Sequence, residues 1–106
     1  MFGLSRKDEE IDINVNEIDN LIGIIELIDI REPYEYSSGS IKSAKNIPMD
    51  TLLNDAEKYL NKGEKYYIIC RSGARSARAC TYLREQGYDV VNVSGGVISY
   101  EGANRI

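Results

Sequence analysis

One stretch in the second half of the chain limits the possible folds more than any other. An apolar run, residues 66–69, ends at Cys70, and after a short loop residues 75–86 have the periodicity of an amphipathic helix that stops at Gly87. A second apolar run, residues 89–93, follows directly. Strand, helix and strand in this order predict a crossover between parallel strands. We therefore expect an α/β fold, with helices on both faces of a mostly parallel sheet.

The other segments extend this alternation along the chain. The expected strands, all short and mostly apolar, are residues 11–15, 25–30, 44–48, 66–69 and 89–93. The other expected helical segments are residues 17–21 with Asn16 as a cap, 34–36, 49–61 and 97–100. A chain of 106 residues is long enough for one packed core. We divide it into a polar lead-in, residues 1–9, and one domain, residues 10–106.

The content of histidine and cysteine excludes several kinds of catalysis. The chain has no histidine and two cysteines. Without histidine, neither a Ser-His-Asp nor a Cys-His arrangement is available. Two thiols also cannot complete a four-ligand zinc site unless carboxylates contribute. We therefore expect no metal and no organic cofactor, and a nucleophile activated by backbone dipoles and arginines.

Charge is distributed unevenly along the chain. The formal net charge is −4, which argues against nonspecific binding of nucleic acid. The segment from Lys65 to Arg84 nevertheless carries five of the thirteen cations and none of the seventeen acids. This basic segment surrounds Cys70. No apolar run is long enough to span a bilayer, and the N-terminus lacks the pattern of a signal peptide, so we expect a cytoplasmic protein that binds no membrane.

Cys70 has the setting of a reactive cysteine. It stands at the carboxyl end of a strand, where loop N–H groups and the positive end of a helix dipole favour the thiolate, the reactive form. The ordinary alternative, a small buried apolar residue, does not call for arginines and a glycine beside the thiol. Cys80 is different, because it shares an apolar helix face with Ala79 and Leu83. We interpret Cys80 as part of the core.

Three motifs in order resemble the rhodanese family of single-domain thiosulfate sulfurtransferases. They are Asp29-Ile30-Arg31-Glu32-Pro33-Tyr34-Glu35-Tyr36, continued by the segment from Gly39 to Pro48; the loop Cys70-Arg71-Ser72-Gly73-Ala74-Arg75-Ser76; and Gly95-Gly96-Val97. The resemblance covers nearly the whole chain and implies a rhodanese-like three-layer fold. It also implies transfer of a sulfane sulfur from a donor such as thiosulfate to a thiol or cyanide, through a persulfide on Cys70. The chain departs from the family pattern at Ser40, where histidine is usual, and at Tyr100, where tryptophan is common.

The resemblance assigns roles to the residues around Cys70. Cys70 is the expected catalytic residue, and the residues expected to bind substrate and persulfide are Arg71, Ser72, Gly73, Ala74, Arg75 and Ser76. Gly73 is expected to have a positive φ, and Ser76 is alternatively a helix N-cap. The residues interpreted as supporting the site are Asp29, Arg31 and Glu35. Asp29 ends a strand within reach of the loop, while Arg31 and Glu35 are placed to form an ion pair.

Two other functions stay open at this point. One is a non-enzymatic rhodanese-like module that carries sulfur or docks a partner, with a sulfur-relay protein as its partner class. The other is a cysteine-dependent phosphatase, because a Cys…Arg loop at a helix N-terminus also suits phosphate. Phosphatase loops of this kind place five residues between cysteine and arginine. Here Ser76 stands where such a loop would have its arginine, and Arg75 comes one residue earlier. This shorter spacing favours sulfur transfer.

Overall fold

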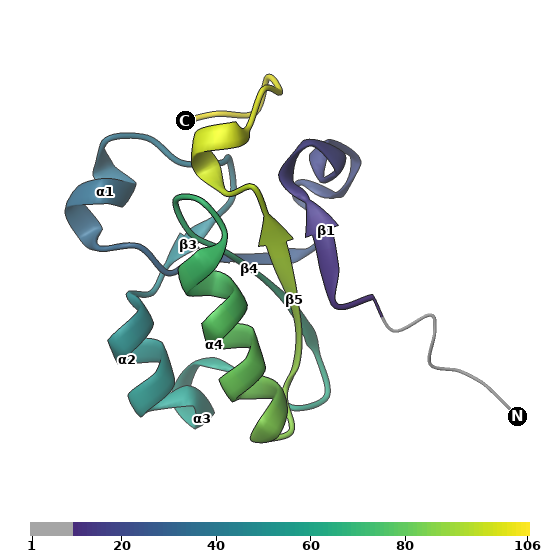
Figure 1. The fold of residues 1–106 in the computed structure, drawn as a ribbon, viewed down its shortest axis with the longest axis vertical. Helices are drawn as coiled ribbons and strands as arrows, with labels where there is room; N and C mark the ends of the chain where they lie inside the picture. Colours follow the sequence, from purple (N-terminus) through teal and green to yellow (C-terminus); the bar gives the residue numbers. More distant parts are fainter. Residues whose placement is uncertain (1–9) are drawn as a thin grey trace, which may run out of the picture.

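The computed structural model describes residues 10–106, and the predicted lead-in, residues 1–9, lies outside the described residues. Within that range, five parallel strands form one sheet in the order β1-β5-β4-β2-β3 (Figure 1). The strands are β1 (Asp12–Asn14), β2 (Glu26–Asp29), β3 (Lys45–Asn46), β4 (Lys65–Ile69) and β5 (Asp89–Ser94). The predicted α/β fold with a parallel sheet of five short strands is confirmed.

The helical segments are mostly short. The α-helices are α1 (Pro33–Ser37), α2 (Met49–Asn54), α3 (Ala56–Tyr59) and α4 (Ala74–Glu85), and the 3-10 turns are η1 (Val15–Glu17), η2 (Asp19–Leu21) and η3 (Val97–Ser99). The prediction of one helix over residues 49–61 is wrong. Asp55, with φ −136° and ψ 46°, separates α2 from α3. The helix breaks here because Asn54 and Asp55 are two consecutive weak helix formers.

The predicted cap at Asn16 is also wrong. Asn14 caps η1, and its side-chain oxygen accepts a hydrogen bond from the Asn16 N–H at 2.9 Å. The side chain of Asn16 instead donates to the carbonyl of Ser99 at 3.0 Å. Asn16 therefore ties the first helical turn to the last one rather than starting a helix.

The sheet separates two clusters of buried apolar side chains, which makes three layers. Along β4, Tyr66 and Ile68 pack into one cluster, whereas Tyr67 and Ile69 pack into the other, as the alternation of a strand requires. The first cluster lies under α2, α3 and α4 and includes Leu83 of α4. Short helical turns and the segment around Tyr100 cover the second. Among residues 10–106, no helix is long and apolar enough to cross a membrane.

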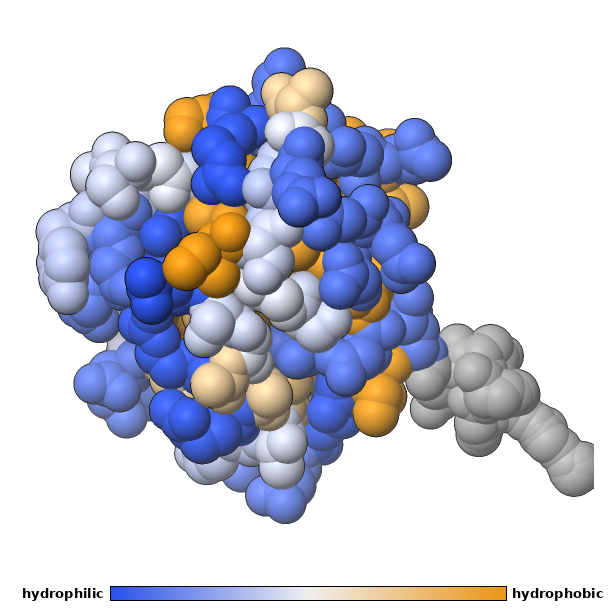
Figure 2. All heavy atoms as spheres, turned by 45° about the horizontal axis from the view of Figure 1, so that its top comes forward, coloured by the Kyte–Doolittle hydropathy of each residue, from blue (hydrophilic) through white to orange (hydrophobic). Residues whose placement is uncertain are grey.

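The parallel strands bring several loops to one edge of the sheet. Ile28 of β2, Ile68 of β4 and Asn92 of β5 are aligned in register, so the residues that follow these strands meet at their carboxyl ends. With this edge turned forward, the surface is mostly hydrophilic, with a small apolar patch near its centre (Figure 2). Ligands of open parallel sheets usually bind at this end of the strands. The predicted site therefore lies where the fold favours one.

Candidate active site

Cys70 is the first residue after β4, and its side chain points inward. The residue is 1% exposed, and its Sγ atom accepts hydrogen bonds from the backbone N–H groups of Gly73, at 3.1 Å, and Ser76, at 3.3 Å. Gly73 has φ +105°, as predicted, and this left-handed conformation turns the chain back toward the sulfur. Ser76 belongs to the first turn of α4, a helix of 12 residues, so the positive end of the helix dipole also faces the sulfur.

The hydrogen bonds at Sγ outweigh the effect of burial on the thiol. Burial of Cys70 acts to raise its pKa, because it penalises the charged form. The Ser76 hydroxyl and the backbone N–H groups of Ser76, Gly73 and Ser72 stabilise the thiolate, and together they hold the pKa of Cys70 below its ordinary value. The loop thus converts a buried thiol into one that ionises more readily.

Cys80 shows what burial does without such donors. It is fully buried on the inner face of α4, as predicted for a core residue. Burial raises the pKa of its thiol to about 12. Cys80 therefore stays protonated at neutral pH, whereas the pKa of Cys70 is lowered.

Ser76 connects Cys70 to two residues that sequence reasoning missed. Its Oγ atom lies 3.3 Å from the sulfur of Cys70 and 2.5 Å from Oδ1 of Asn92 in β5. The side-chain N–H of Asn92 donates to Asp12 of β1 at 2.9 Å. The alternative role of Ser76 as an N-cap is wrong, since Gly73 holds that position. One signal was present, because Asn92 interrupts the apolar run of β5 with a polar side chain that needs a partner.

The backbone after β5, which includes Gly95 and Gly96, packs against the backbone of the Cys70 loop. The N–H of Val97 donates to the carbonyl of Cys70 at 2.9 Å, and that of Ile98 donates to the carbonyl of Arg71 at 3.0 Å. Gly96 has φ +68°, and a Cβ atom there would overlap the backbone of Arg71. Gly95 lies against Gly73, and a Cβ atom added at Gly73 would come 3.2 Å from the Gly95 nitrogen. The third sequence motif is therefore the backbone support of the second.

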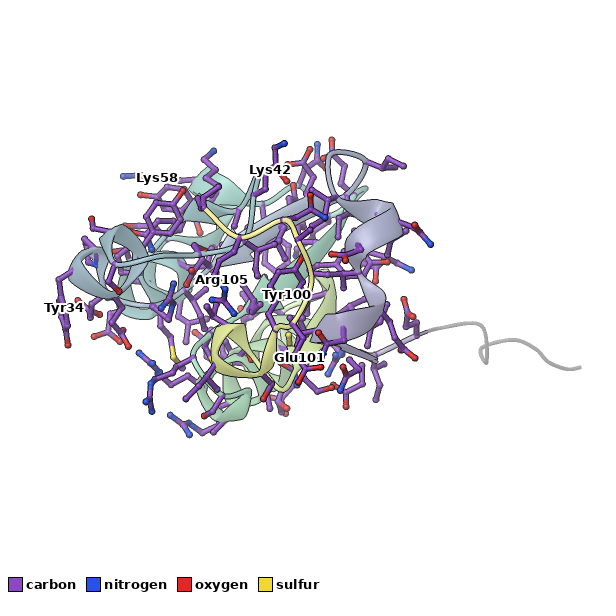
Figure 3. All side chains as sticks on the ribbon, turned by 90° about the horizontal axis from the view of Figure 1, so that it is seen from above. Tyr34, Lys42, Lys58, Tyr100, Glu101 and Arg105 are labelled. Atoms are coloured by element: carbon purple, nitrogen blue, oxygen red, sulfur yellow. The ribbon has the colours of Figure 1, made fainter. Side chains whose placement is uncertain are left out.

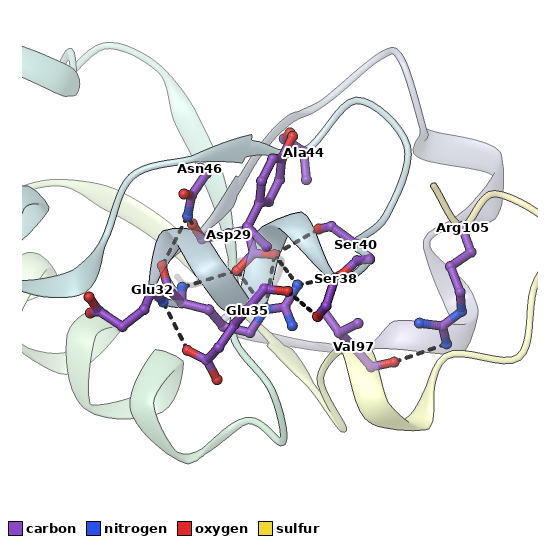
Figure 4. Close-up of polar contacts among 12 residues, drawn as sticks. Asp29, Glu32, Glu35, Ser38, Ser40, Ala44, Asn46, Val97 and Arg105 are labelled. Atoms are coloured by element: carbon purple, nitrogen blue, oxygen red, sulfur yellow. Dashed lines mark hydrogen bonds and ion pairs between the residues drawn. The ribbon is translucent and has the colours of Figure 1, made fainter.

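Arg75 binds the carboxylate of Glu35 in α1 through its two terminal guanidinium nitrogens, at 3.0 Å each. This hydrogen bond lowers the pKa of Glu35 to about 2, against the opposing effect of burial, and the same bond raises the pKa of Arg75. Glu35 also accepts the backbone N–H of Glu32 at the start of α1 at 2.8 Å (Figure 4). The pair thus braces the loop against α1. An anion-binding role for Arg75 stays a prediction.

The predicted ion pair between Arg31 and Glu35 is wrong. Arg31 folds back onto Asp29, with distances of 3.0 Å from Nε to Oδ1 and 2.8 Å from a terminal nitrogen to Oδ2. Both residues are buried, and a buried charge needs a partner close by. Asp29 also accepts the hydroxyl of Ser40 at 2.7 Å, and Arg31 donates to the carbonyl of Gly39 at 2.7 Å (Figure 4). Asp29 and Arg31 therefore fix the segment around Ser40.

A cavity of about 250 Å³ opens beside the loop, and Arg31, Arg71 and Arg105 contribute to its lining. Arg105 lies over the ring of Tyr100 and donates to the carbonyl of Tyr100 at 2.7 Å (Figure 3). Tyr100 is buried in the core. A larger hollow, of about 510 Å³, lies at the opposite end of β4 and β5, away from Cys70. Among residues 10–106, no three cysteine or carboxylate side chains gather closely enough to hold a metal ion.

The remaining loop residues lie at the surface. Arg71, Ser72 and Ala74 are exposed, whereas Cys70 and Ser76 are buried beneath them. Of the predicted loop, Ser72, Gly73 and Ser76 thus turn donors toward the sulfur of Cys70, and substrate binding by the loop stays a prediction. Asp29 and Arg31 lie outside this cluster, where their side-chain hydrogen bonds go to each other and to residues 39–40.

Comparison with known proteins agrees with this geometry. A protein of Allochromatium vinosum named as a sulfurtransferase is 44% identical over 75 residues, which are 70% of this chain and 69% of that protein. YtwF of Bacillus subtilis is 44% identical over 79 residues, or 74% of this chain and 76% of YtwF. The crystal structure of a rhodanese-related protein from Thermoplasma volcanium superimposes with a TM-score of 0.80 at 36% identity, covering 91% of this chain and 97% of that one.

The match extends over the fold as well as the loop. The family model described as "Rhodanese-like domain" matches residues 14–103, which run from the end of β1 to beyond η3 and include all three sequence motifs. This range holds Cys70, the loop that surrounds its sulfur and the glycines that support the loop. The chain therefore belongs to the rhodanese-like domain family.

Proposed function

We propose that this protein is a sulfurtransferase that takes a sulfane sulfur from a donor such as thiosulfate, holds it as a persulfide on Cys70, and passes it to a thiol or to cyanide. The observation that supports this most directly is the convergence of the Gly73 and Ser76 N–H groups on the sulfur of Cys70. Donors fixed in this way stabilise a negatively charged sulfur without rearranging during the reaction. Family membership, with relatives named as sulfurtransferases, supports the same class of reaction.

In the loading step, the thiolate of Cys70 attacks the outer sulfur of thiosulfate. The electron pair of the thiolate forms a new S–S bond, the S–S bond of thiosulfate breaks, and its electron pair leaves with sulfite. Cys70 becomes a persulfide whose terminal sulfur carries the negative charge. The loop N–H groups are available to bind that charge directly, and the charges of Arg71 and of Arg75, which stays paired with Glu35, act on it from a distance.

In the unloading step, a nucleophile attacks the terminal sulfur of the persulfide. With cyanide the product is thiocyanate, and with a thiolate the product is a persulfide of the acceptor. The electron pair of the broken S–S bond returns to Cys70, which regenerates the thiolate. The two half-reactions predict ping-pong kinetics, and neither consumes an oxidant or a reductant.

A protein that relays sulfur is a natural partner for either half-reaction. The acceptor thiol in the unloading step and the donor in the loading step can each belong to such a protein. The predicted cytoplasmic location is in keeping with Cys70 and Cys80 as free thiols, since reducing compartments maintain that state.

Phosphate transfer is less well supported. Four residues separate Cys70 from Arg75, and the guanidinium of Arg75 is occupied by both carboxylate oxygens of Glu35. A phosphatase of this type needs its arginine on the phosphate oxygens, so Arg75 would first have to leave a bidentate ion pair.

The test is mass spectrometry of the intact protein after incubation with thiosulfate and removal of the excess. We expect the wild type and the Cys80→Ala variant to gain one sulfur atom, and the Cys70→Ser variant to gain none. Adding cyanide to the loaded protein should remove the sulfur and release thiocyanate. Equal loading of Cys70→Ser and wild type would disprove the assignment of Cys70.

Two further outcomes distinguish the alternatives. A wild type that gains no sulfur from thiosulfate but gains it from a persulfidated protein is a sulfur carrier rather than a thiosulfate sulfurtransferase. A wild type that gains no sulfur from either donor and hydrolyses an aryl phosphate would replace the proposal with the phosphatase.

A further inference from the structure

A chain of hydrogen bonds leads from Cys70 across the sheet to an exposed carboxylate. The thiol of Cys70 donates to Oγ of Ser76 at 3.3 Å, the Ser76 hydroxyl lies 2.5 Å from Oδ1 of Asn92, and Nδ2 of Asn92 donates to Asp12 at 2.9 Å. Asp12 and Asn92 are paired residues of the neighbouring strands β1 and β5. These hydrogen bonds thus link the Cys70 loop to β1 and β5, which supply none of the backbone N–H donors to the sulfur.

The hydroxyl of Ser76 has one proton and, besides the sulfur, two carbonyl acceptors for it: Oδ1 of Asn92 at 2.5 Å and the backbone carbonyl of Gly73 at 3.1 Å. With Cys70 as a thiol, the thiol proton points to Ser76, and the Ser76 proton is free to bond with Asn92, the nearest acceptor. With Cys70 as a thiolate, the same hydroxyl stabilises the charge only if it turns toward the sulfur. Asn92 Oδ1 then faces the lone pairs of Ser76 and lacks its donor, which is costly for a buried carbonyl.

Asp12 decides which end of the Asn92 amide faces Ser76. A carboxylate only accepts hydrogen bonds, so it binds the NH₂ group of Asn92 and directs the carbonyl oxygen toward Ser76. If the amide were reversed, its NH₂ group would donate to Ser76, and the Ser76 hydroxyl would be free to donate to the sulfur.

We propose that Asn92, oriented by Asp12, holds the hydroxyl of Ser76 away from Cys70 and so opposes ionisation of the thiol. Asn92 and Asp12 are then positioning residues that act on the sulfur through Ser76. Ionisation releases the thiol proton to solvent, while the Ser76 proton stays on its oxygen and changes direction only. The proposal concerns the resting thiol, so it stands or falls independently of sulfur transfer.

Other charged groups around the site have to be separated from this effect. They are the thiol of Cys80 and the Arg75 side chain from α4, Glu35 from α1, the Asp29–Arg31 pair after β2, and Arg84, which lies beside β1. The charge of Asp12 itself also disfavours a nearby thiolate. An experiment on Asp12 therefore has to distinguish its charge from its role as a hydrogen-bond acceptor.

The experiment measures the rate of alkylation of Cys70 by iodoacetamide as a function of pH, with the modified peptide identified by mass spectrometry. Cys80 does not interfere, because its pKa is about 12. Asp12→Asn removes the charge and keeps an acceptor for Asn92, whereas Asp12→Ala removes both. We expect the midpoint of the pH dependence of alkylation to lie about one pH unit lower in Asp12→Ala than in Asp12→Asn, which is a tenfold change in the ionisation constant of Cys70.

The same pair of variants in a Ser76→Ala background provides the decisive control. Without the hydroxyl, the orientation of Asn92 has no route to the sulfur, so the two Asp12 variants should then have the same midpoint. This double-mutant cycle isolates the coupling between Asp12 and Ser76. Circular dichroism establishes that each variant is folded.

Three results would overturn the proposal. The first is an equal midpoint for Asp12→Ala and Asp12→Asn, which would assign the effect to charge. The second is a difference that persists in the Ser76→Ala background. The third comes from Asn92→Leu, which removes the nearer of the two competing carbonyls at similar size and tests the idea even if Asp12→Ala fails to fold. Its midpoint should fall below that of the wild type, and an unchanged or higher midpoint would contradict us.

Discussion

Cys70 and Cys80 are equally buried, at 1% and 0% exposure, yet the pKa values of their thiols shift in opposite directions. Both sulfurs belong to the same cluster of buried residues under α4. Burial acts to raise the pKa of both thiols. The pKa of Cys80 rises to about 12, whereas hydrogen bonds lower that of Cys70. Hydrogen-bond donors, led by the Ser76 hydroxyl, and not exposure to solvent, therefore decide which of the two thiols ionises more readily.

The largest expected effect separates the two thiols completely. Cys70→Ala should lower the rate of thiocyanate formation from thiosulfate and cyanide by roughly 10⁴-fold or more, because covalent transfer has no other nucleophile. Cys80→Ala should keep the rate near that of the wild type and lower the free energy of unfolding by about 1–2 kcal/mol, since it leaves a small cavity. Steady-state assays and urea denaturation measure the two. A similar loss of rate in both variants would show that the two thiols do not differ in this reaction.

Gly96→Ala tests whether the support behind the loop distinguishes Cys70 from Cys80. A Cβ atom at Gly96 would overlap the Arg71 backbone, so we expect a loss of about 2–4 kcal/mol in the free energy of unfolding, combined with slower alkylation of Cys70. The matched control is Gly23→Ala, which has a similarly positive φ of +87° with no atom near the new methyl group. It should lose about 1 kcal/mol from backbone strain alone. Equal losses would show that the overlap relaxes without cost.

Ser76→Ala should make Cys70 more like Cys80. The substitution removes the hydroxyl that stabilises the thiolate and leaves the backbone N–H groups in place, so the pKa of Cys70 should rise. The pH dependence of alkylation measures the change. Ser72→Ala, in the exposed part of the loop, is the control and should leave the midpoint unchanged. A lower midpoint in Ser76→Ala would mean that the hydroxyl opposes the thiolate.

The smallest effect concerns the ion pair between Arg75 and Glu35, which lies beside the Cys70 loop and has no counterpart at Cys80. The pKa of Glu35 in the folded protein is about 2, below its ordinary 4.5. Its contribution to stability is therefore complete above pH 4.5 and is lost as the pH falls toward 2. Glu35→Gln should lose about 1 kcal/mol at neutral pH and show a shallower decline of stability in acid, measured by urea denaturation. Parallel declines of variant and wild type would assign the acid sensitivity to other carboxylates.

Much of the fold could be predicted because it depends on patterns within short segments. The apolar run before Cys70, the periodicity of α4 and the stop at Gly87 are all local, and the structure follows them closely. The helix over residues 49–61 was predicted too long because apolar spacing continues across Asp55, although the backbone turns there. Spacing alone does not record such a break.

The partners of the site residues were harder to predict than the residues themselves. Glu35 was assigned to Arg31, its neighbour in sequence, but α1 directs it to Arg75, which comes from a loop much later in the chain. Asn92 and Asp12 were missed for the same reason, since only the order of strands brings them together behind Ser76. Long-range pairing depends on topology, and one sequence does not reveal it at the level of single side chains.

The hydrogen bonds from Val97 and Ile98 to the carbonyls of Cys70 and Arg71 also bear on how the protein folds. The loop is complete only after the chain has passed through α4 and β5 and returned to it, and such non-local contacts form late. A peptide of residues 70–76 would have the sequence of the loop without its shape. During refolding, the reactivity of Cys70 should therefore recover with the last structural phase, which makes alkylation of this thiol a measure of the completed domain.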